Sequence, residues 1–349
     1  MRRKFLFCCL LIPVALYGQT GPVSGSVMNP NISLIGDFRG MYTSELARKF
    51  EFMFNEAEVS FQSSIDPYAR ADVFFSWGRD SAGEYSSSVE EAYVTTLSLP
   101  MDIRLKAGRY RMTTGRLNTV HPHTLPFSDL PAANRGFFGE EGLIDEGVSL
   151  SWLIPNPLDF YQEIVVEASD VPAESPFFMR PASGRYLYLA HLKNFIELDE
   201  NTTVELGLTG LSGPNEDLRT STIGGIDFTL KWKPLRFNRY RSLTWQSEVF
   251  LGHYGEADGG SVRSLGCYSF LTYQLAVQWF MTGRFDYTNL PRSADVVERG
   301  YSATLGWYAT EFQKIGLSGK LVTGNAVADR SEIALRWIFV IGAHGAHAY

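Results

Sequence analysis

The chain has 349 residues, of which 45% are hydrophobic, 14% aromatic and 20% charged, with a formal net charge of −7. This composition excludes an intrinsically disordered chain, a collagen-like repeat and a long coiled coil. The longest apolar run, Phe5 to Tyr17, is also shorter than the roughly 18 to 20 residues that a membrane-spanning helix needs. The pattern in which the apolar residues are spread must therefore carry the information about the fold.

The amino terminus has the features of a secretory signal peptide. Arg2, Arg3 and Lys4 precede the apolar run, and small residues followed by a polar stretch come after it. We therefore expect residues 1–18 to be a signal peptide and residues 19–31 to form a short periplasmic segment. Loss of the three cations changes the net charge to −10, and nucleic acid is not an expected partner of so acidic an exported protein.

Cysteine usage agrees with export. Cys8 and Cys9 belong to the predicted signal peptide, which leaves Cys267 as the single cysteine of the mature chain. The sequence therefore predicts neither an intrachain disulfide nor a cysteine metal cluster, and it calls for no cofactor.

From Asn31 onward the dominant pattern has a period of two, which is typical of strands with one apolar and one polar face. The apolar faces are about ten residues long and end in turn residues, and no segment predicts an amphipathic helix. Examples of such faces are Ala71, Val73, Phe75 and Trp77; Ile226, Phe228, Leu230 and Trp232; and Ile333, Leu335, Trp337, Phe339 and Ile341.

The connections between these segments alternate in length along the chain, with seven short ones between eight long, polar and glycine-rich ones. Fifteen connections join 16 strands, and their alternation in length predicts an antiparallel up-and-down sheet. Even strand number, short periplasmic turns and long extracellular loops are typical of outer-membrane β-barrels of Gram-negative bacteria. We expect such a transmembrane barrel over residues 32–349. The short connections are 65–68, 98–102, 154–159, 197–201, 233–242, 272–276 and 309–312, and the long ones 42–49, 79–88, 112–146, 170–185, 211–222, 254–263, 288–299 and 323–330.

The chain also resembles outer-membrane porins, in particular the phosphate-selective porin O/P-like family. The stretches that carry the resemblance are Gly108-Arg109-Tyr110-Arg111 with Gly115-Arg116-Leu117-Asn118, Tyr273-Gln274 with Trp279, Gly283 to Tyr287, and the terminal Tyr349. The resemblance implies a channel for passive diffusion of small hydrophilic solutes or ions, a homotrimer in lipid and lipopolysaccharide, and a third long loop, 112–146, folded into the pore. It also implies that the barrel-assembly machinery reads Tyr349.

The charges on the predicted lumen face depart from the name of that family. Basic and acidic residues are mixed there with a small acidic excess, whereas a ring of one sign selects the opposite ion. The sequence therefore favours weak selectivity rather than phosphate selectivity. The predicted pore-lining and constriction residues are Arg39, Glu56, Glu58, Arg70, Asp72, Arg104, Lys106, Arg116, Asp129, Arg135, Glu140, Glu141, Arg284, Asp286 and Arg336.

Two other readings remain open at this stage, and a third is not expected. His121 and His123, with Glu140 or Glu141 nearby, are ligand types that suit zinc, so a metal-linked uptake role is one alternative, although the spacing fixes no third ligand. An outer-membrane hydrolase is another, although no motif joins a nucleophile to a histidine. An energised transporter would need a plug domain before the barrel, which the expected periplasmic segment is too short to hold.

Overall fold

A computed structural model describes most of the predicted barrel. The predicted signal peptide, residues 19–29 of the periplasmic segment and Tyr349 lie outside the described residues. The described ranges are 30–44, 50–79, 83–158, 160–172, 175–181, 184–325 and 328–342.

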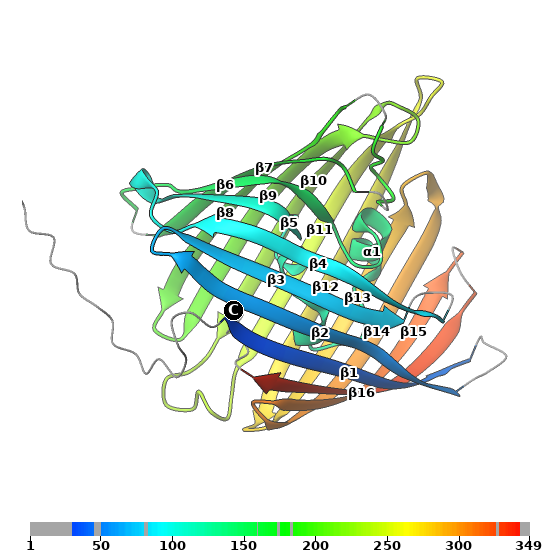
Figure 1. Cartoon of the computed structure of the whole chain (residues 1–349). Coiled ribbons are helices and arrows are strands. Elements are labelled where there is room, and N and C mark those ends of the chain that lie inside the picture. The colour runs from blue at the N-terminus through cyan, green and yellow to red at the C-terminus, as the bar shows by residue number, and fades with distance from the viewer. Residues whose placement is uncertain are drawn as a thin grey trace, which may run out of the picture.

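Within these ranges, 16 strands form one closed barrel, as predicted. Each strand pairs antiparallel with its neighbour in sequence, and the ring closes where the first strand pairs with the last, from Ser33 opposite Gly342 to Thr43 opposite Glu332 (Figure 1). The strands are β1 (Asn31–Thr43), β2 (Phe50–Asp66), β3 (Ala69–Arg79), β4 (Tyr85–Thr96), β5 (Ile103–Arg111), β6 (Ile144–Leu153), β7 (Tyr161–Ser169), β8 (Leu187–Asp199), β9 (Thr202–Pro214), β10 (Thr220–Trp232), β11 (Leu243–Gly255), β12 (Ser261–Ala276), β13 (Trp279–Leu290), β14 (Ser293–Thr310), β15 (Gln313–Gly324) and β16 (Arg330–Gly342).

Several predicted connections differ from the structure in position or length, mostly because the strands are longer than predicted. Residues 288–299 are not a long loop, because β13 and β14 continue through them and Leu290 pairs with Ser293. The turn expected at 272–276 lies after Ala276, where β12 ends. A strand that extends beyond the membrane needs no outward apolar residue, so its polar composition there is the same as that of a loop.

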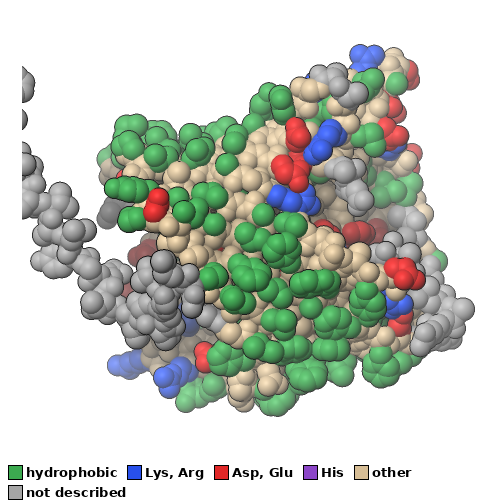
Figure 2. Space-filling view, viewed as in Figure 1, with side chains coloured by type: hydrophobic (Ala, Val, Ile, Leu, Met, Phe, Trp, Pro, Cys, Tyr) green, Lys and Arg blue, Asp and Glu red, His purple; other side chains and the backbone are tan. Residues whose placement is uncertain are grey.

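The alternation of side chains matches an apolar outer face and a polar inner face. On β16, Leu335 is 53% exposed and Trp337 44% exposed, whereas Arg336 between them is only 4% exposed. Figure 2 shows hydrophobic side chains covering much of the outer wall. No helix among the described residues is long and apolar enough to cross a bilayer.

The third long connection, residues 112–143, folds into the barrel and is called loop L3. It is slightly shorter than the predicted 112–146, because β6 begins at Ile144. L3 contains two 3-10 helices, η2 (Leu117–Thr119) and η3 (Pro122–Thr124), and one α-helix, α1 (Ala132–Phe138), which lies within the ring of strands (Figure 1). The sequence pattern did not predict α1, since seven residues are too few to establish a helical period.

The outer half of the lumen contains an apolar core that the sequence analysis did not anticipate. Phe137 and Phe138 of α1 pack with Phe177 of the next long loop and with Phe250 of β11. Gly266 on β12 leaves room for this contact, because a Cβ there would lie 2.7 Å from the Phe137 ring. Aromatic residues of two loops thus fill part of a barrel that would otherwise be wide open.

The outward face of β16 gives a direct test of the membrane assignment. Replacing Leu335 with Arg places a charge in the lipid-facing belt and should lower the free energy of unfolding by about 2–4 kcal/mol if the site lies at the membrane midplane. Leu335→Val should have little effect. Urea-induced unfolding in lipid vesicles measures both, and equal stability of Leu335→Arg and wild type would contradict a lipid-facing β16.

Candidate functional site

Loop L3 enters the lumen by binding two acidic side chains of the wall. The backbone N–H and the hydroxyl of Thr113 donate to Glu167 on β7, each at 3.0 Å. The backbone N–H groups of Arg116 and Leu117 donate to Glu248 Oε1 on β11, at 2.8 and 2.7 Å. Carboxylates of two strands thus satisfy donors of a loop segment that has few backbone partners of its own.

A second stretch of L3, which includes Phe127 and Asp129, is held mainly by basic side chains of the wall. Asp129 accepts from Arg284 on β13 at 3.0 Å and from Lys320 on β15 at 2.5 Å. Arg336 on β16 donates to the Phe127 carbonyl at 2.8 Å and pairs with Asp37 on β1. Burial raises the pKa of Asp129, but Arg284 and Lys320 outweigh it and hold that pKa well below its usual range.

Between these two stretches, the two histidines of L3 contact acidic residues of the wall. His121 Nδ1 lies 3.0 Å from Glu58 Oε2 on β2, and His121 Nε2 lies 2.8 Å from Glu91 Oε1 on β4. His123 Nδ1 lies 3.5 Å from the same oxygen of Glu58. Burial lowers the pKa of His121, but Glu58 and Glu91 outweigh it and raise that pKa to about 10.

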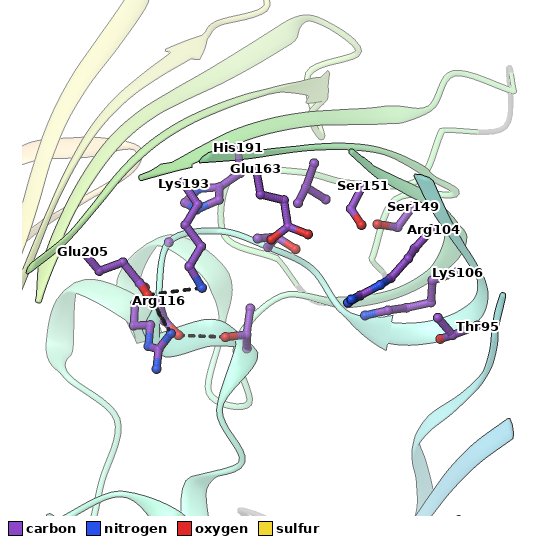
Figure 3. A pocket seen from close by; sticks show the side chains of 14 residues that line it. Thr95, Arg104, Lys106, Arg116, Ser149, Ser151, Glu163, His191, Lys193 and Glu205 are labelled. Carbon is purple, nitrogen blue, oxygen red and sulfur yellow. Dashed lines mark hydrogen bonds and ion pairs between the residues drawn. The ribbon is translucent and has the colours of Figure 1, made fainter. Parts of the chain in front are cut away.

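Several cavities border L3, and two of them contain most of the predicted site residues. The first lies against β4–β9 and contains Arg104, Lys106, Lys193 and Glu163 (Figure 3). Lys193 pairs with Glu205 at 3.2 Å, whereas neither Arg104 nor Lys106 forms an ion pair with a described carboxylate. Lys106 instead lies over two tyrosine rings. The first cavity therefore presents two cations that no carboxylate neutralises.

The second cavity lies between L3 and strands β1–β4. Its acidic lining includes Glu56, Glu90, Glu140 and Glu141, and its basic lining includes Arg135, which pairs with Glu298 on β14 at 3.0 Å. The first cavity, toward β5, thus has an excess of cations, whereas the second, toward β2, has five acidic side chains and four arginines.

The predicted site residues divide into four groups. Arg284, Asp286 and Arg336 are buried beneath L3. Arg284 and Arg336 bind L3 directly, and Asp286 binds Arg284. Arg70 and Asp72 pair with each other on β3 and line neither cavity. Glu58 binds the histidines. The residues that line a cavity are Arg39, Glu56, Arg104, Lys106, Arg116, Asp129, Arg135, Glu140 and Glu141.

The acidic residues that contact the histidines in the structure are not the ones that the sequence suggested. Glu58 and Glu91 contact His121, whereas Glu140 and Glu141 follow α1 and line the second cavity. Nearness in sequence was misleading, because α1 carries the chain away from the histidines. The inward parity of Glu58 and Glu91 was readable from the strands, but their meeting with a loop was not.

Comparison of the sequence with known proteins does not assign the chain to a family. No family model matches the chain. An uncharacterized protein of Aquifex aeolicus is 26% identical over 95% of this chain and 82% of its own length. Membership of the phosphate-selective O/P-like family therefore remains an expectation.

Solved structures with the same fold are porins and channels of the outer membrane. The channel DcaP of Acinetobacter baumannii has a TM-score of 0.63 at 10% identity, over 90% of this chain and 99% of that one. An anion-selective porin from Comamonas acidovorans has a TM-score of 0.62 at 8% identity, over 90% and 100%. The trimer form of the Vibrio cholerae outer-membrane protein OmpT has a TM-score of 0.59 at 8% identity, over the same shares. At these identities, the likeness establishes the porin fold.

The anchor at Asp129 can be tested by removing its charge. Asp129→Asn leaves Lys320 and the buried Arg284 without the carboxylate of L3, so amide hydrogen exchange in peptides from L3 should become faster while the strands stay protected. Because the pKa is lowered, this anchor is complete at neutral pH and is lost only as the pH falls below about 4.

Asp102→Asn, in the exposed turn before β5, is the matched control for Asp129→Asn and should leave exchange in L3 unchanged. Unchanged exchange in Asp129→Asn would mean that the ion pairs do not hold the loop.

Proposed function

We propose that the chain forms a channel for passive diffusion of small hydrophilic solutes and ions across the outer membrane of a Gram-negative bacterium. The observation that carries this proposal is a closed barrel with an apolar outer wall and a charged interior that keeps two cavities beside an inserted loop. A barrel of about 16 strands is wide enough for an aqueous channel, whereas about eight strands would be filled by side chains.

In this proposal, L3 is the constriction. Its contacts with β2, β7, β11, β13 and β16 narrow the lumen, and the two cavities are the water-filled routes past it. A solute that passes L3 meets Arg104 and Lys106 on one side or Glu140 and Glu141 on the other. Such an arrangement favours polar solutes over apolar ones, because only polar groups replace the water lost in the narrow region.

Charge supports weak ion selectivity. Most buried charges of the lumen pair with one another, as Arg284 does with Asp286 and Arg336 with Asp37. Paired charges contribute little net field, so selectivity depends on residues such as Arg104 and Lys106. The proposal therefore does not include selectivity for phosphate.

The assembly belongs to the same proposal. The trimer form of OmpT supports a homotrimer. In our proposal, this homotrimer is embedded in lipid and lipopolysaccharide. Insertion by the barrel-assembly machinery through Tyr349 completes it, and the chain performs no catalytic step.

The first test is electrical. Folded, heat-modifiable protein added to a planar lipid bilayer should produce discrete conductance steps that increase with salt concentration. A folded protein that never conducts would refute the channel.

The second test is ion selectivity. Replacing both Arg104 and Lys106 with Gln should shift the reversal potential in a KCl gradient toward cation preference, because the two unneutralised cations of the first cavity are lost. Arg239→Gln, in the exposed turn after β10, removes one charge far from the cavities and should not shift it.

Charge removal on the other side of L3 should have the opposite effect. Glu140→Ala with Glu141→Ala should shift the reversal potential toward anion preference. If conductance and selectivity stay unchanged in both pairs of variants, L3 does not constrict the pore.

A further inference from the structure

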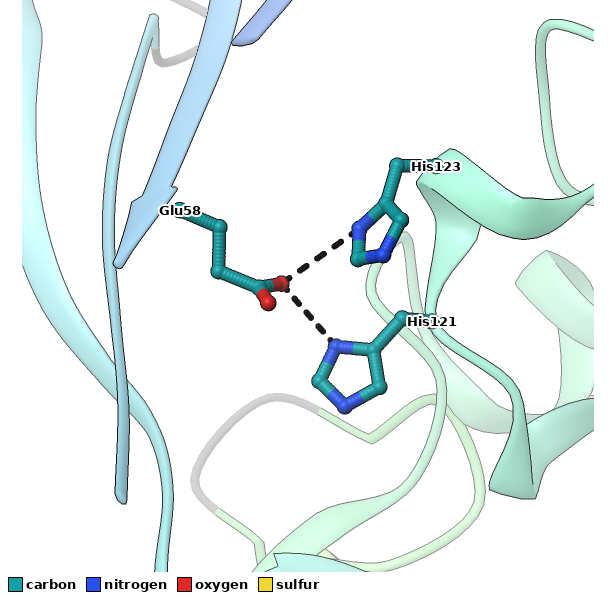
Figure 4. Close-up of side chains that lie close together, drawn as sticks. All are labelled: Glu58, His121 and His123. Atoms are coloured by element: carbon teal, nitrogen blue, oxygen red, sulfur yellow. Dashed lines mark hydrogen bonds and ion pairs between the residues drawn. The ribbon is translucent and has the colours of Figure 1, made fainter. Parts of the chain in front are cut away.

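Three ligand atoms for a metal converge where L3 meets β2. Nδ1 of His121 and Nδ1 of His123 lie 3.0 and 3.5 Å from Oε2 of Glu58. The three ligand atoms lie within 4.8 Å of one another, and all three residues are buried. Figure 4 shows both imidazoles directed at the same carboxylate, one from each end of the short segment His121-Pro122-His123.

These distances match those of a compact metal site. Zinc binds imidazole nitrogen and carboxylate oxygen at about 2.0–2.1 Å, so two ligand atoms of a tetrahedron lie about 3.3 Å apart. The contacts of Glu58 with His121 and His123, at 3.0 and 3.5 Å, bracket that value. Two imidazoles with one carboxylate favour zinc or a similar transition metal over calcium or magnesium, which prefer oxygen ligands.

The outer contacts of His121 are also those of a metal ligand. Its Nε2 lies 2.8 Å from Glu91 Oε1, and the second oxygen of Glu91 accepts the backbone N–H of Arg111 at 3.0 Å. A carboxylate on the far nitrogen of a ligating histidine fixes the ring orientation and increases the basicity of the ligating nitrogen. The orientation of His121 is therefore already set by the wall.

Charge favours a cation at this position. Carboxylate oxygens of Glu56, Glu58 and Glu90 lie within 4.8 Å of one another, and Glu91 adds a fourth acidic group. Among the described residues, Arg111 is the one Lys or Arg side chain within ion-pair distance of these four groups. Buried like charges repel strongly unless a cation or a proton offsets them.

An ion can reach the site from water. Glu56 and Glu90 line the second cavity, and Glu58 lies beside both of them. The carboxylates of this lining attract cations, so a divalent ion can reach Glu58 past Glu56 and Glu90.

We propose that Glu58, His121 and His123 bind one zinc ion, or a similar divalent transition metal, that clamps L3 to β2. The metal replaces any proton on Nδ1 of either imidazole, which is released to water, and its two charges offset the carboxylates. The clamp would fix the middle of L3, between its anchors on β11 and on β13. This inference goes beyond the proposed function, since a channel needs no metal to conduct.

The test uses folded, tag-free protein in detergent after treatment with a chelator, with Co²⁺ as the probe. Wild type should bind one Co²⁺ per chain with visible absorption bands of a four-coordinate site, and Zn²⁺ should displace it. Glu58→Gln and His123→Ala should each weaken binding at least tenfold, while the heat-modifiable barrel is retained. No binding by wild type, or unchanged binding in both variants, would overturn the proposal.

A second histidine pair provides the control. His344 and His347 lie outside the described residues, and the double variant His344→Ala with His347→Ala should keep the full Co²⁺ stoichiometry. Loss of binding in this variant would assign the metal to the carboxyl-terminal tail and overturn the site at Glu58.

One measurement needs no variant of L3. X-ray absorption of zinc-loaded wild type should show two imidazole ligands with oxygen completing the shell, and a shell of oxygen alone would overturn the proposal. Bilayer conductance in the presence of chelator separates the two proposals, because the channel can conduct whether or not the metal site exists.

Discussion

Backbone pairing in a solvent without water is the constraint on which this structure depends. In hydrocarbon, an unpaired N–H or carbonyl costs several kcal/mol, so a sheet that crosses a membrane must have no free edge. The pairing of β1 with β16 removes the edge that 16 antiparallel strands would otherwise leave. Closure also separates the two faces of every strand, with lipid outside and a water-accessible lumen inside.

The width of the barrel creates the next requirement. Sixteen strands enclose more space than inward side chains can fill, so loops complete the interior. The described structure meets this with two kinds of packing: aromatic contacts around Phe137 and Phe177 in the outer half, and ion pairs from wall residues to L3. The aromatic contacts exclude water from one region, and the ion pairs fix L3 across the lumen while leaving a cavity on each side.

Buried charges in the lumen therefore have two different roles. Arg284 and Arg336 pair with carboxylates, and Glu248 accepts two backbone N–H groups of L3, so all three side chains hold the loop in place. Arg104 and Lys106 form no ion pair with a carboxylate that the structure describes, so their field acts on whatever enters the first cavity. Around Glu58, ligand atoms of His121 and His123 converge on one carboxylate among further acidic groups, and this geometry is the basis for the metal proposal.

The sequence by itself determined which face of each strand points outward, because a period of two is a local property of the chain. The outward positions of Leu335 and Trp337 and the inward position of Arg336 follow from their spacing alone. Turn residues in the sequence indicated most of the strand ends. The sequence could not determine that residues 288–299 form strand, since strands beyond the membrane look like loops. Only the tertiary structure decided which inward charges meet: Glu58 with His121, Asp129 with Arg284 and Glu248 with Arg116 are 63, 155 and 132 residues apart. Such partners depend on barrel closure and on the path of L3, and neither is encoded within one strand.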